Sequence, residues 1–401
     1  MSIAFSIDYP RMVAVEVGGS ARKPRLKRVA VAELKEPRNE DGTPVADKQA
    51  HLNAQVAEFL KANKLTGGKQ LLLAGPDALR FRELQLAFSD RRQIDRVIQF
   101  QVEGAIPNAA IEDLSIGYHI VAKGENSTRL LVHAAEKDYI RQRLTALEEG
   151  GASIDSVDSH LSGTLNLGLL HEELAADNPP ALWLDFAGTT AAVIVVEGGE
   201  VRAGRVFVSP YLAGASGATA TADQVKAAAG AAQAEAEKRA REIAGGTDSV
   251  HGMPKAESTN IGAAEVADRI KHMSRDDLLK FIQRVAVEAK RTLYMTPGLP
   301  EPQRLVISGL GAEGSHLSAL LANELGLEKY AAVDLMDTIC SADQKSGLPD
   351  CGELTYLTGV ALKGLGRDFT GIDFRYGDLA PGTLMDYART PLAFAATLAL
   401  L

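Results

Sequence analysis

Two stretches of the chain, about 180 residues apart, repeat one order of short apolar runs and turns. In each copy the pattern predicts a strand, an acid, a turn and two further strands. The acid at the end of the first strand is Asp8 in one copy and Asp185 in the other. The predicted strands are 3–8, 12–17 and 28–34 in the first copy, and 181–185, 191–196 and 201–208 in the second. A duplicated unit of this kind predicts two similar lobes.

Each copy continues with a helix and a buried strand. Apolar residues at helical spacing predict helices at 47–64 and 276–294, and the strands 70–74 and 304–308 follow them. Further helices are predicted at 161–174, 316–325 and 353–365. Three strands, a helix and a strand make up half of a ribonuclease-H-like unit. The fold class predicted here is therefore α/β with two ribonuclease-H-like lobes.

A separate small α/β module interrupts the first copy. Its predicted elements are an extended segment at 81–86, a helix at 91–104, strands at 115–121 and 128–135, and a helix at 138–149. We expect a first lobe at 1–78 and 152–175, an inserted subdomain at 79–151, a second lobe at 176–368 and a tail at 369–401. Segment 214–263, inside the second lobe, is dense in alanine, glycine and charged residues and is expected to be a low-complexity insertion without its own core.

Composition narrows the classes of function. The net charge of −9 argues against a nucleic-acid binder, which needs a basic face to neutralise phosphates. The two cysteines, Cys340 and Cys351, fit neither a zinc site nor a redox CxxC, so free thiols in a reducing compartment are expected. The first residues lack the basic region and apolar run of a signal peptide, so we expect the N-terminal part to stay in the cytoplasm.

A glycine motif offers one enzymatic alternative. The segment from Ser308 to Gly314 contains GxGxxG between a predicted strand and a predicted helix, as in dinucleotide-binding proteins. The strand comes late in the second copy, and only one more strand, 330–334, follows it. The hypothesis of an NAD-dependent enzyme therefore depends on this motif alone. The eight histidines show no metal-ligand spacing, and the chain has neither a GxSxG elbow nor a P-loop.

The order of these features resembles the FtsA and PilM branch of actin-like proteins, and the PilM/GspL family in particular. The segments that carry the resemblance are 79–84, 98–107, 130–135, 144–152, 185–188 and 306–314. Segment 372–380 is similar to the part of GspL that precedes its single membrane helix. The resemblance covers nearly the whole chain apart from 214–263. It implies a two-lobed actin-like ATPase fold with a small inserted subdomain of the FtsA/PilM type.

The resemblance also implies a nucleotide site between the two hairpins. Its candidate residues are Asp8, Asp185, Gly188, Thr189, Thr190, Gly309 and Gly311, with ATP as the possible ligand and a magnesium ion near Asp185. In the first hairpin Pro10 lacks an N–H donor, and no glycine allows a phosphate to approach the backbone. We therefore expect weak or absent nucleotide binding. The alternative for either acid is a turn residue that accepts hydrogen bonds from nearby N–H groups.

The implied function is that of a scaffold. Proteins of this family belong to the inner-membrane platform of type IV pilus assembly or type II secretion, on the cytoplasmic face of the bacterial inner membrane. The implied partners are platform proteins and the assembly ATPase, and we expect subdomain 79–151 to contact them. The alternative is an active ATPase or a sugar-kinase-like enzyme on the same fold, although a kinase needs intact phosphate loops and a base beside its acceptor.

The tail ends in an uncharged apolar run at 391–401. As an α-helix, eleven residues reach about 16 Å, roughly half of a bilayer core. The run is either the last helix of the soluble domain or the start of a membrane helix that continues past residue 401. Its lack of a polar face favours the second. The tail, or a partner, is expected to hold the protein at the membrane.

Overall fold

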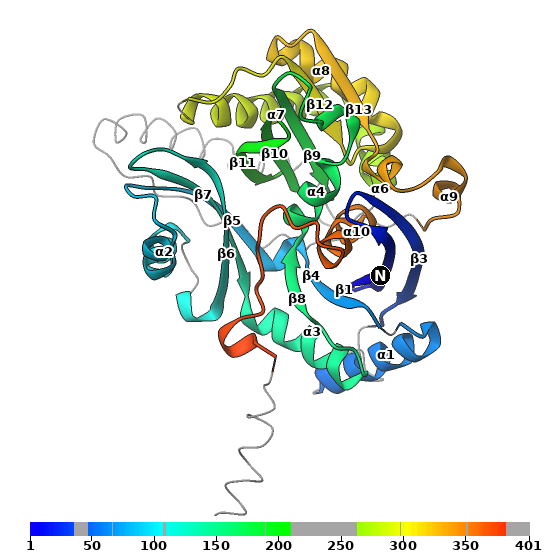
Figure 1. Cartoon of the computed structure of the whole chain (residues 1–401). Coiled ribbons are helices and arrows are strands. Elements are labelled where there is room, and N and C mark those ends of the chain that lie inside the picture. The colour runs from blue at the N-terminus through cyan, green and yellow to red at the C-terminus, as the bar shows by residue number, and fades with distance from the viewer. Residues whose placement is uncertain are drawn as a thin grey trace, which may run out of the picture.

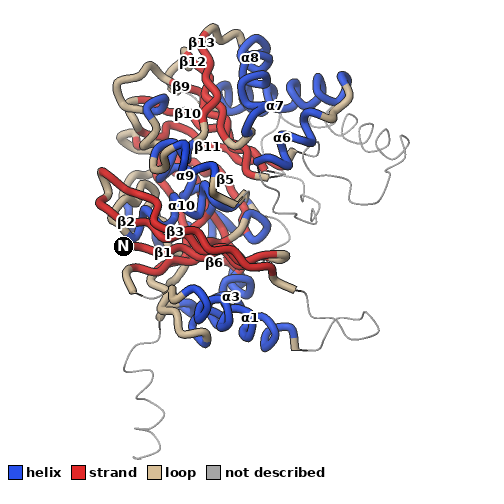
Figure 2. Tube along the Cα trace, turned by 90° about the vertical axis from the view of Figure 1, so that its right-hand side faces the viewer, coloured by secondary structure: helices blue, strands red, loops and turns tan. Residues whose placement is uncertain are grey.

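The computed structural model describes residues 1–35, 47–65, 67–106, 110–188, 190–209, 263–296, 298–349 and 352–381. Within these ranges the strands form two five-stranded sheets and one three-stranded sheet. Figure 1 shows a first lobe that contains the N-terminus, a second lobe above it and a smaller subdomain on the left. Figure 2, turned by 90°, shows the two large sheets one above the other.

The first-lobe sheet is buried on both faces. In spatial order its strands are β3 (Lys23–Glu33), β2 (Arg11–Ser20), β1 (Ser2–Asp8), β4 (Lys69–Ala74) and β8 (Ser156–Ser159). The first three are antiparallel, and β1, β4 and β8 are parallel. Ile3, Phe5 and Ile7 point to one face, where helices α1 (Lys48–Asn63) and α3 (Lys137–Glu149) cover them. The opposite face packs against the centre of the molecule.

The second-lobe sheet repeats the strand order of the first. Its strands are β11 (Glu200–Val208), β10 (Thr190–Glu197), β9 (Ala181–Ala187), β12 (Arg304–Ser308) and β13 (Lys329–Val333). Again three strands are antiparallel, and β9, β12 and β13 are parallel. Helices α6 (Ala263–Lys271), α7 (Arg275–Met295) and α8 (Gly314–Leu325) cover its outer face. The predicted duplication is therefore present strand for strand.

Two helices lie between the sheets and join the lobes into one core. They are α4 (His160–Gly168) and α10 (Glu353–Gly364). Leu165 of α4 and Leu357 of α10 belong to the same buried cluster as Val15 of the first sheet and Trp183 of the second. The sequence assigned 353–365 to the second lobe, but α10 packs against α4, β1, β2 and β4. The chain thus returns to the first lobe through this helix.

The two central helices approach closely because glycine faces glycine. A β-carbon on Gly359 would lie 1.8 Å from the carbonyl oxygen of Gly163, and one on Gly163 would lie 2.1 Å from that of Tyr356. Atoms at these distances overlap, and the clashing atoms are backbone, so a side chain could not move out of the way. The distance between α4 and α10 therefore depends on both glycines.

The inserted subdomain is a three-stranded sheet with one helix. Its strands are β5 (Leu79–Leu86), β7 (Thr128–Glu136) and β6 (Leu114–Lys123), and α2 (Arg91–Ala105) covers one face. The sequence placed 138–149 in the same module. In the structure this segment is α3, whose Ile140, Leu144 and Leu147 belong to the first-lobe core instead. The short helix α9 (Ala342–Ser346) follows β13 in the second lobe.

Candidate functional site

Asp8 ends β1 and is bound to helix α3. The Tyr139 hydroxyl lies 2.7 Å from each carboxylate oxygen of Asp8, and Arg143 Nη2 lies 2.8 Å from Oδ1. Arg143 Nε also donates to the Ile7 carbonyl, and the guanidinium lies 3.3 Å from the Tyr139 ring centroid. Burial, above all, raises the pKa of Tyr139, so it stays a neutral donor. The carboxylate of Asp8 is therefore paired within its own lobe.

Arg11, at the start of the second strand of the first hairpin, forms an ion pair with helix α10. The turn of this hairpin contains a cis peptide between Tyr9 and Pro10. Arg11 Nε lies 3.1 Å from Oε1 of Glu353, the buried first residue of α10. A helix N-terminus stabilises anions, and here the carboxylate of Glu353 occupies that position. Burial raises the pKa of Glu353, while Arg11 opposes the shift.

Asp185 is buried on β9 and bonded on both oxygens. Ser308 Oγ on β12 donates to Oδ1 at 2.5 Å, and Thr164 Oγ1 on α4 donates to Oδ2 at 3.3 Å. Trp183 Nε1 in turn donates to Ser308 Oγ at 2.8 Å. Burial raises the pKa of Asp185 to about 6, against the effect of these hydrogen bonds. The acid therefore connects β9, β12 and α4.

The candidate glycines and hydroxyls lie at two turns of the second lobe. Gly188 has a φ of 60° in the β9–β10 turn, Thr190 Oγ1 donates to the Ala187 carbonyl, and Thr189 lies outside the described residues. Gly309 has a φ of 83°, and a β-carbon on it would lie 1.9 Å from the Phe186 carbonyl oxygen. Glycine is therefore required there by the close approach of β9 itself.

The structure brings some of the predicted residues together and separates others. Asp185 and Ser308 are register partners, so Asp185 and Gly309 lie at the same end of adjacent strands. Gly311 opens the short turn that leads into α8. Asp8 belongs to the other sheet. Among the described residues, no group of three histidine, cysteine, aspartate or glutamate side chains could hold a metal ion.

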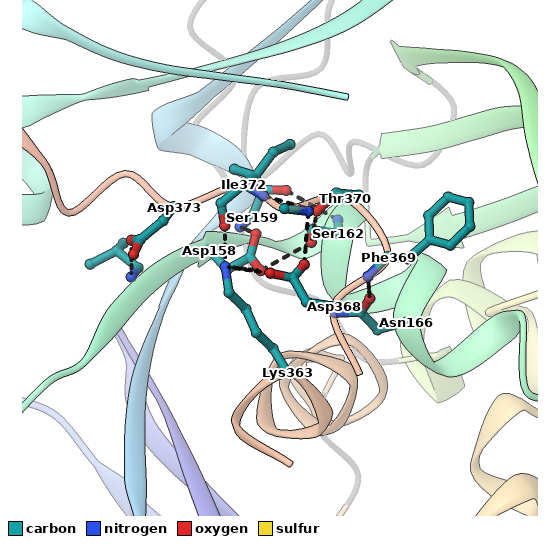
Figure 3. A network of polar contacts seen from close by, with 12 residues as sticks. Asp158, Ser159, Ser162, Asn166, Lys363, Asp368, Phe369, Thr370, Ile372 and Asp373 are labelled. Carbon is teal, nitrogen blue, oxygen red and sulfur yellow. Dashed lines mark hydrogen bonds and ion pairs between the residues drawn. The ribbon is translucent and has the colours of Figure 1, made fainter. Parts of the chain in front are cut away.

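A second polar cluster, which the sequence analysis missed, surrounds Asp158 at the end of β8 (Figure 3). Asp158 is fully buried, and Lys363 Nζ of α10 lies 3.2 Å from its Oδ2. The Ser159 N–H and the Ser162 hydroxyl also donate to this carboxylate. Lys363 Nζ lies 3.5 Å from Asp368 as well, so one ammonium faces two acids. Burial raises the pKa of Asp158 to about 6, and Lys363 opposes this shift.

This cluster holds one end of a segment that we call the strap, residues 366–379. The strap crosses from α10 to the inserted subdomain (Figure 1). Lys363 donates to the Ile372 carbonyl, and the Ser162 and Thr370 hydroxyls lie 2.6 Å apart. Ile372 and Phe374 are 1% and 0% exposed. The strap therefore packs as part of the folded core.

The strap joins the first lobe to the inserted subdomain. On the lobe side, the Phe374 N–H donates to the Val157 carbonyl at 2.9 Å. On the subdomain side, the Ser115 hydroxyl donates to the Phe374 carbonyl at 2.9 Å. The Tyr376 hydroxyl accepts from the Ile116 N–H and donates to its carbonyl. Strand β8 of the first lobe and strand β6 of the subdomain are therefore both bonded to strap residues 374–376.

The sequence analysis did single out part of the strap, segment 372–380, but interpreted it as a membrane-proximal tail. The resemblance to GspL at 372–380 assigned this segment to a tail near the membrane. The alternation of Ile372 and Phe374 between polar residues indicates a half-buried extended segment. No local pattern identified Lys363 and Asp158 as partners, because they are separated by 205 residues.

No protein-family model matches this chain, and no curated protein matches it. Among solved structures, a chain of the PilM–PilN type IV pilus biogenesis complex matches with a TM-score of 0.56 and 18% identity. The match covers 91% of this chain and 98% of that one. The chain has a PilM-type, actin-like fold. The predicted fold class is therefore confirmed.

Two further solved structures are similar at lower scores. The cytoplasmic domain of EpsL, an inner-membrane component of the type II secretion system of Vibrio cholerae, matches at 11% identity and a TM-score of 0.34, over 53% of this chain and 72% of that chain. A Bacteroides thetaiotaomicron protein with an actin-like ATPase fold and unknown function matches at 8% identity and a TM-score of 0.42, over 86% and 93%. The PilM-type fold itself rests on the first match.

Proposed function

We propose that this protein is a scaffold in the inner-membrane platform of type IV pilus assembly or type II secretion. The observation that carries this proposal is the fold match along nearly the whole chain to a component of a type IV pilus biogenesis complex. A scaffold acts by binding, so its partners are platform proteins and the assembly ATPase. The site of action is the cytoplasmic face of the inner membrane.

The structure of the hairpin around Asp8 favours a protein-binding scaffold over an ATP-hydrolysing enzyme. Pro10 has no N–H for a phosphate, and Asp8 is paired with Arg143 and Tyr139. Glu353 places a negative charge at the N-terminus of α10, where a phosphate would otherwise be stabilised. Any nucleotide would have to be held by the second-lobe residues Asp185, Gly188, Thr189, Thr190, Gly309 and Gly311, with magnesium near Asp185. The alternative remains an active ATPase or a sugar-kinase-like enzyme.

Attachment to the membrane would come from the tail or from a partner. Within the described ranges, none of the helices combines the length and the apolar composition that crossing a bilayer requires. The apolar run at 391–401 lies outside those ranges. The apolar run follows the strap in the chain, and the strap is bonded to the inserted subdomain, so a membrane attachment at 391–401 would keep the subdomain within reach of the membrane.

The partner surface we favour is the outer face of α2 in the inserted subdomain. Ile94, Ile98 and Val102 anchor this helix to its sheet. On the opposite side Arg92, Arg96 and Phe100 follow at spacings of four residues and are exposed, Phe100 by 73%. Arginine and aromatic residues dominate binding energy at protein interfaces. Two arginines on a protein of net charge −9 favour an acidic patch on the partner.

Reversing the charge of this face should disrupt partner binding. We expect Arg92→Glu/Arg96→Glu/Phe100→Ser to weaken binding of the full chain to the assembly ATPase of the same genome at least about tenfold, because it removes the anchor and repels an acidic patch. Biolayer interferometry with purified proteins measures this. The matched control, Lys48→Glu/Lys61→Glu on exposed positions of α1, should bind as the wild type does. Equal affinities for both variants would reject α2 as the surface.

A further inference from the structure

The outer face of α7 faces solvent and carries three exposed apolar side chains among polar ones. Leu279, Val287 and Tyr294 are 48%, 54% and 82% exposed. At about 100° per residue they lie within about 80° of one another around the helix axis. Figure 2 shows α7 beside the second-lobe sheet, on the outer side of that lobe. Its inner face, which includes Phe281 and Val285, is fully buried against that sheet.

Charges are arranged along the same face with opposite signs at its two ends. Asp276 is exposed in the first turn of α7. Lys290 lies nearly four turns later, with 42% of its side chain exposed. The Lys290 ammonium is held near Glu324, 3.0 Å from its carbonyl oxygen and 3.8 Å from its carboxylate. Gln283 lies exposed midway between the acid and the base.

We propose that this face pairs with the same face of a second copy of the chain, antiparallel, with the two-fold axis at Gln283. Leu279 and Val287 are each four residues from Gln283, so Leu279 of one copy meets Val287 of the other. Asp276 and Lys290 are each seven residues away, so the acid of one copy meets the base of the other. A patch that is complementary to itself about one axis is what a two-fold dimer requires.

The symmetry favours a second copy over a different partner. A heterologous partner would need neither equal spacing of the apolar residues about one point nor opposite charges at equal distances from it. The contact from Asp276 to Lys290 extends for about 21 Å of helix. One helix pair of that length buries less than the roughly 1,200 Å² of a standard interface, so the dimer is weak and concentration-dependent. This inference does not rest on the proposed scaffold function.

Sedimentation of the full-length protein over a concentration series tests the pairing. The wild type is expected to shift from monomer to dimer as concentration rises. Val287→Glu should weaken association at least about tenfold, since it places two carboxylates in the apolar contact. Tyr330→Ser, at a half-exposed aromatic on the edge strand β13 of the same lobe, should leave association unchanged.

Charge exchange then tests the antiparallel register. Asp276→Lys and Lys290→Glu should each weaken the dimer, because each brings like charges together twice in the symmetric pair. The double variant should regain wild-type association within about threefold, because the pairs are restored with their signs reversed. A wild type that is monomeric at every concentration overturns the proposal. A dimer that tolerates Val287→Glu, or a double variant no better than the singles, also overturns it.

Discussion

Replacing Gly359 by alanine is expected to destabilise the protein by about 3 kcal/mol. The new β-carbon would lie 1.8 Å from the Gly163 carbonyl oxygen, so α4 and α10 would have to move apart. Both helices belong to the core that joins the two sheets, and a shift there loosens both lobes together. Urea unfolding followed by circular dichroism measures the loss.

The control for this substitution is Gly104→Ala. Gly104 lies in α2, and no atom outside its own helix lies within 4 Å of the position a β-carbon would take. Alanine there should leave stability unchanged or raise it by up to about 1 kcal/mol, because glycine costs conformational entropy in a helix. If Gly359→Ala were as stable as the wild type, the close crossing of α4 and α10 would be wrong.

Lys363→Met should cost about 3 kcal/mol at pH 8, because it leaves the fully buried Asp158 carboxylate without its cation. The deficit should shrink as the pH falls. In the folded protein the pKa of Asp158 is already raised from 3.8 to about 6, and loss of Lys363 raises it further. A raised folded-state pKa gives stability that is complete below 3.8 and is lost as the pH rises through the folded-state value.

The double variant Asp158→Asn/Lys363→Met separates the charge from the packing. It removes the buried charge with the cation, so it should recover part of the loss at pH 8 and show little change between pH 5 and pH 8. Amide hydrogen exchange at 372–376 should be faster in Lys363→Met than in the wild type, because Lys363 donates a hydrogen bond to the Ile372 carbonyl. A deficit in Lys363→Met that is equal at both pH values would contradict a buried ionised pair.

The large sheets could be predicted from the sequence because their signals are local. Leu182, Leu184 and Phe186 alternate with Trp183, and β9 buries both sets, one on each side of the sheet. The same runs and turns recur in β1 to β3, so the duplication was visible without any structure. These features depend on residues two positions apart, which a periodic pattern records directly.

Elements that depend on distant contacts could not be predicted in this way. The helical period of α10 says nothing about which sheet it packs against, and its contacts with β1, β2 and β4 come from the other end of the chain. The strap has no regular period, and the Tyr376 hydroxyl meets Ile116 across a separation of 260 residues. Its role as a link between lobe and subdomain exists only in the folded chain.

The candidate site shows the same division. The sequence placed Asp185 at the end of a strand as a candidate nucleotide ligand, but it could not show the hydroxyl partners Ser308 and Thr164, which are 123 and 21 residues away. The sequence also showed that Pro10 removes a backbone N–H donor from the first hairpin. The pairing of Asp8 with Arg143 and of Arg11 with Glu353 was not visible in the sequence, because both partners lie on helices far along the chain.

The most direct test of a scaffold on an ATPase fold is a magnesium-dependent ATP turnover assay on the purified full chain, run beside Asp185→Asn. We expect wild type and variant to show the same rate as a sample without protein, because in the first hairpin Pro10 has no N–H, Asp8 is paired with Arg143 and Arg11 is paired with Glu353. Asp177→Ala, at an exposed acid, serves as a control for the preparation. Robust turnover by the wild type and by Asp177→Ala that is lost in Asp185→Asn would contradict the scaffold and establish the enzyme.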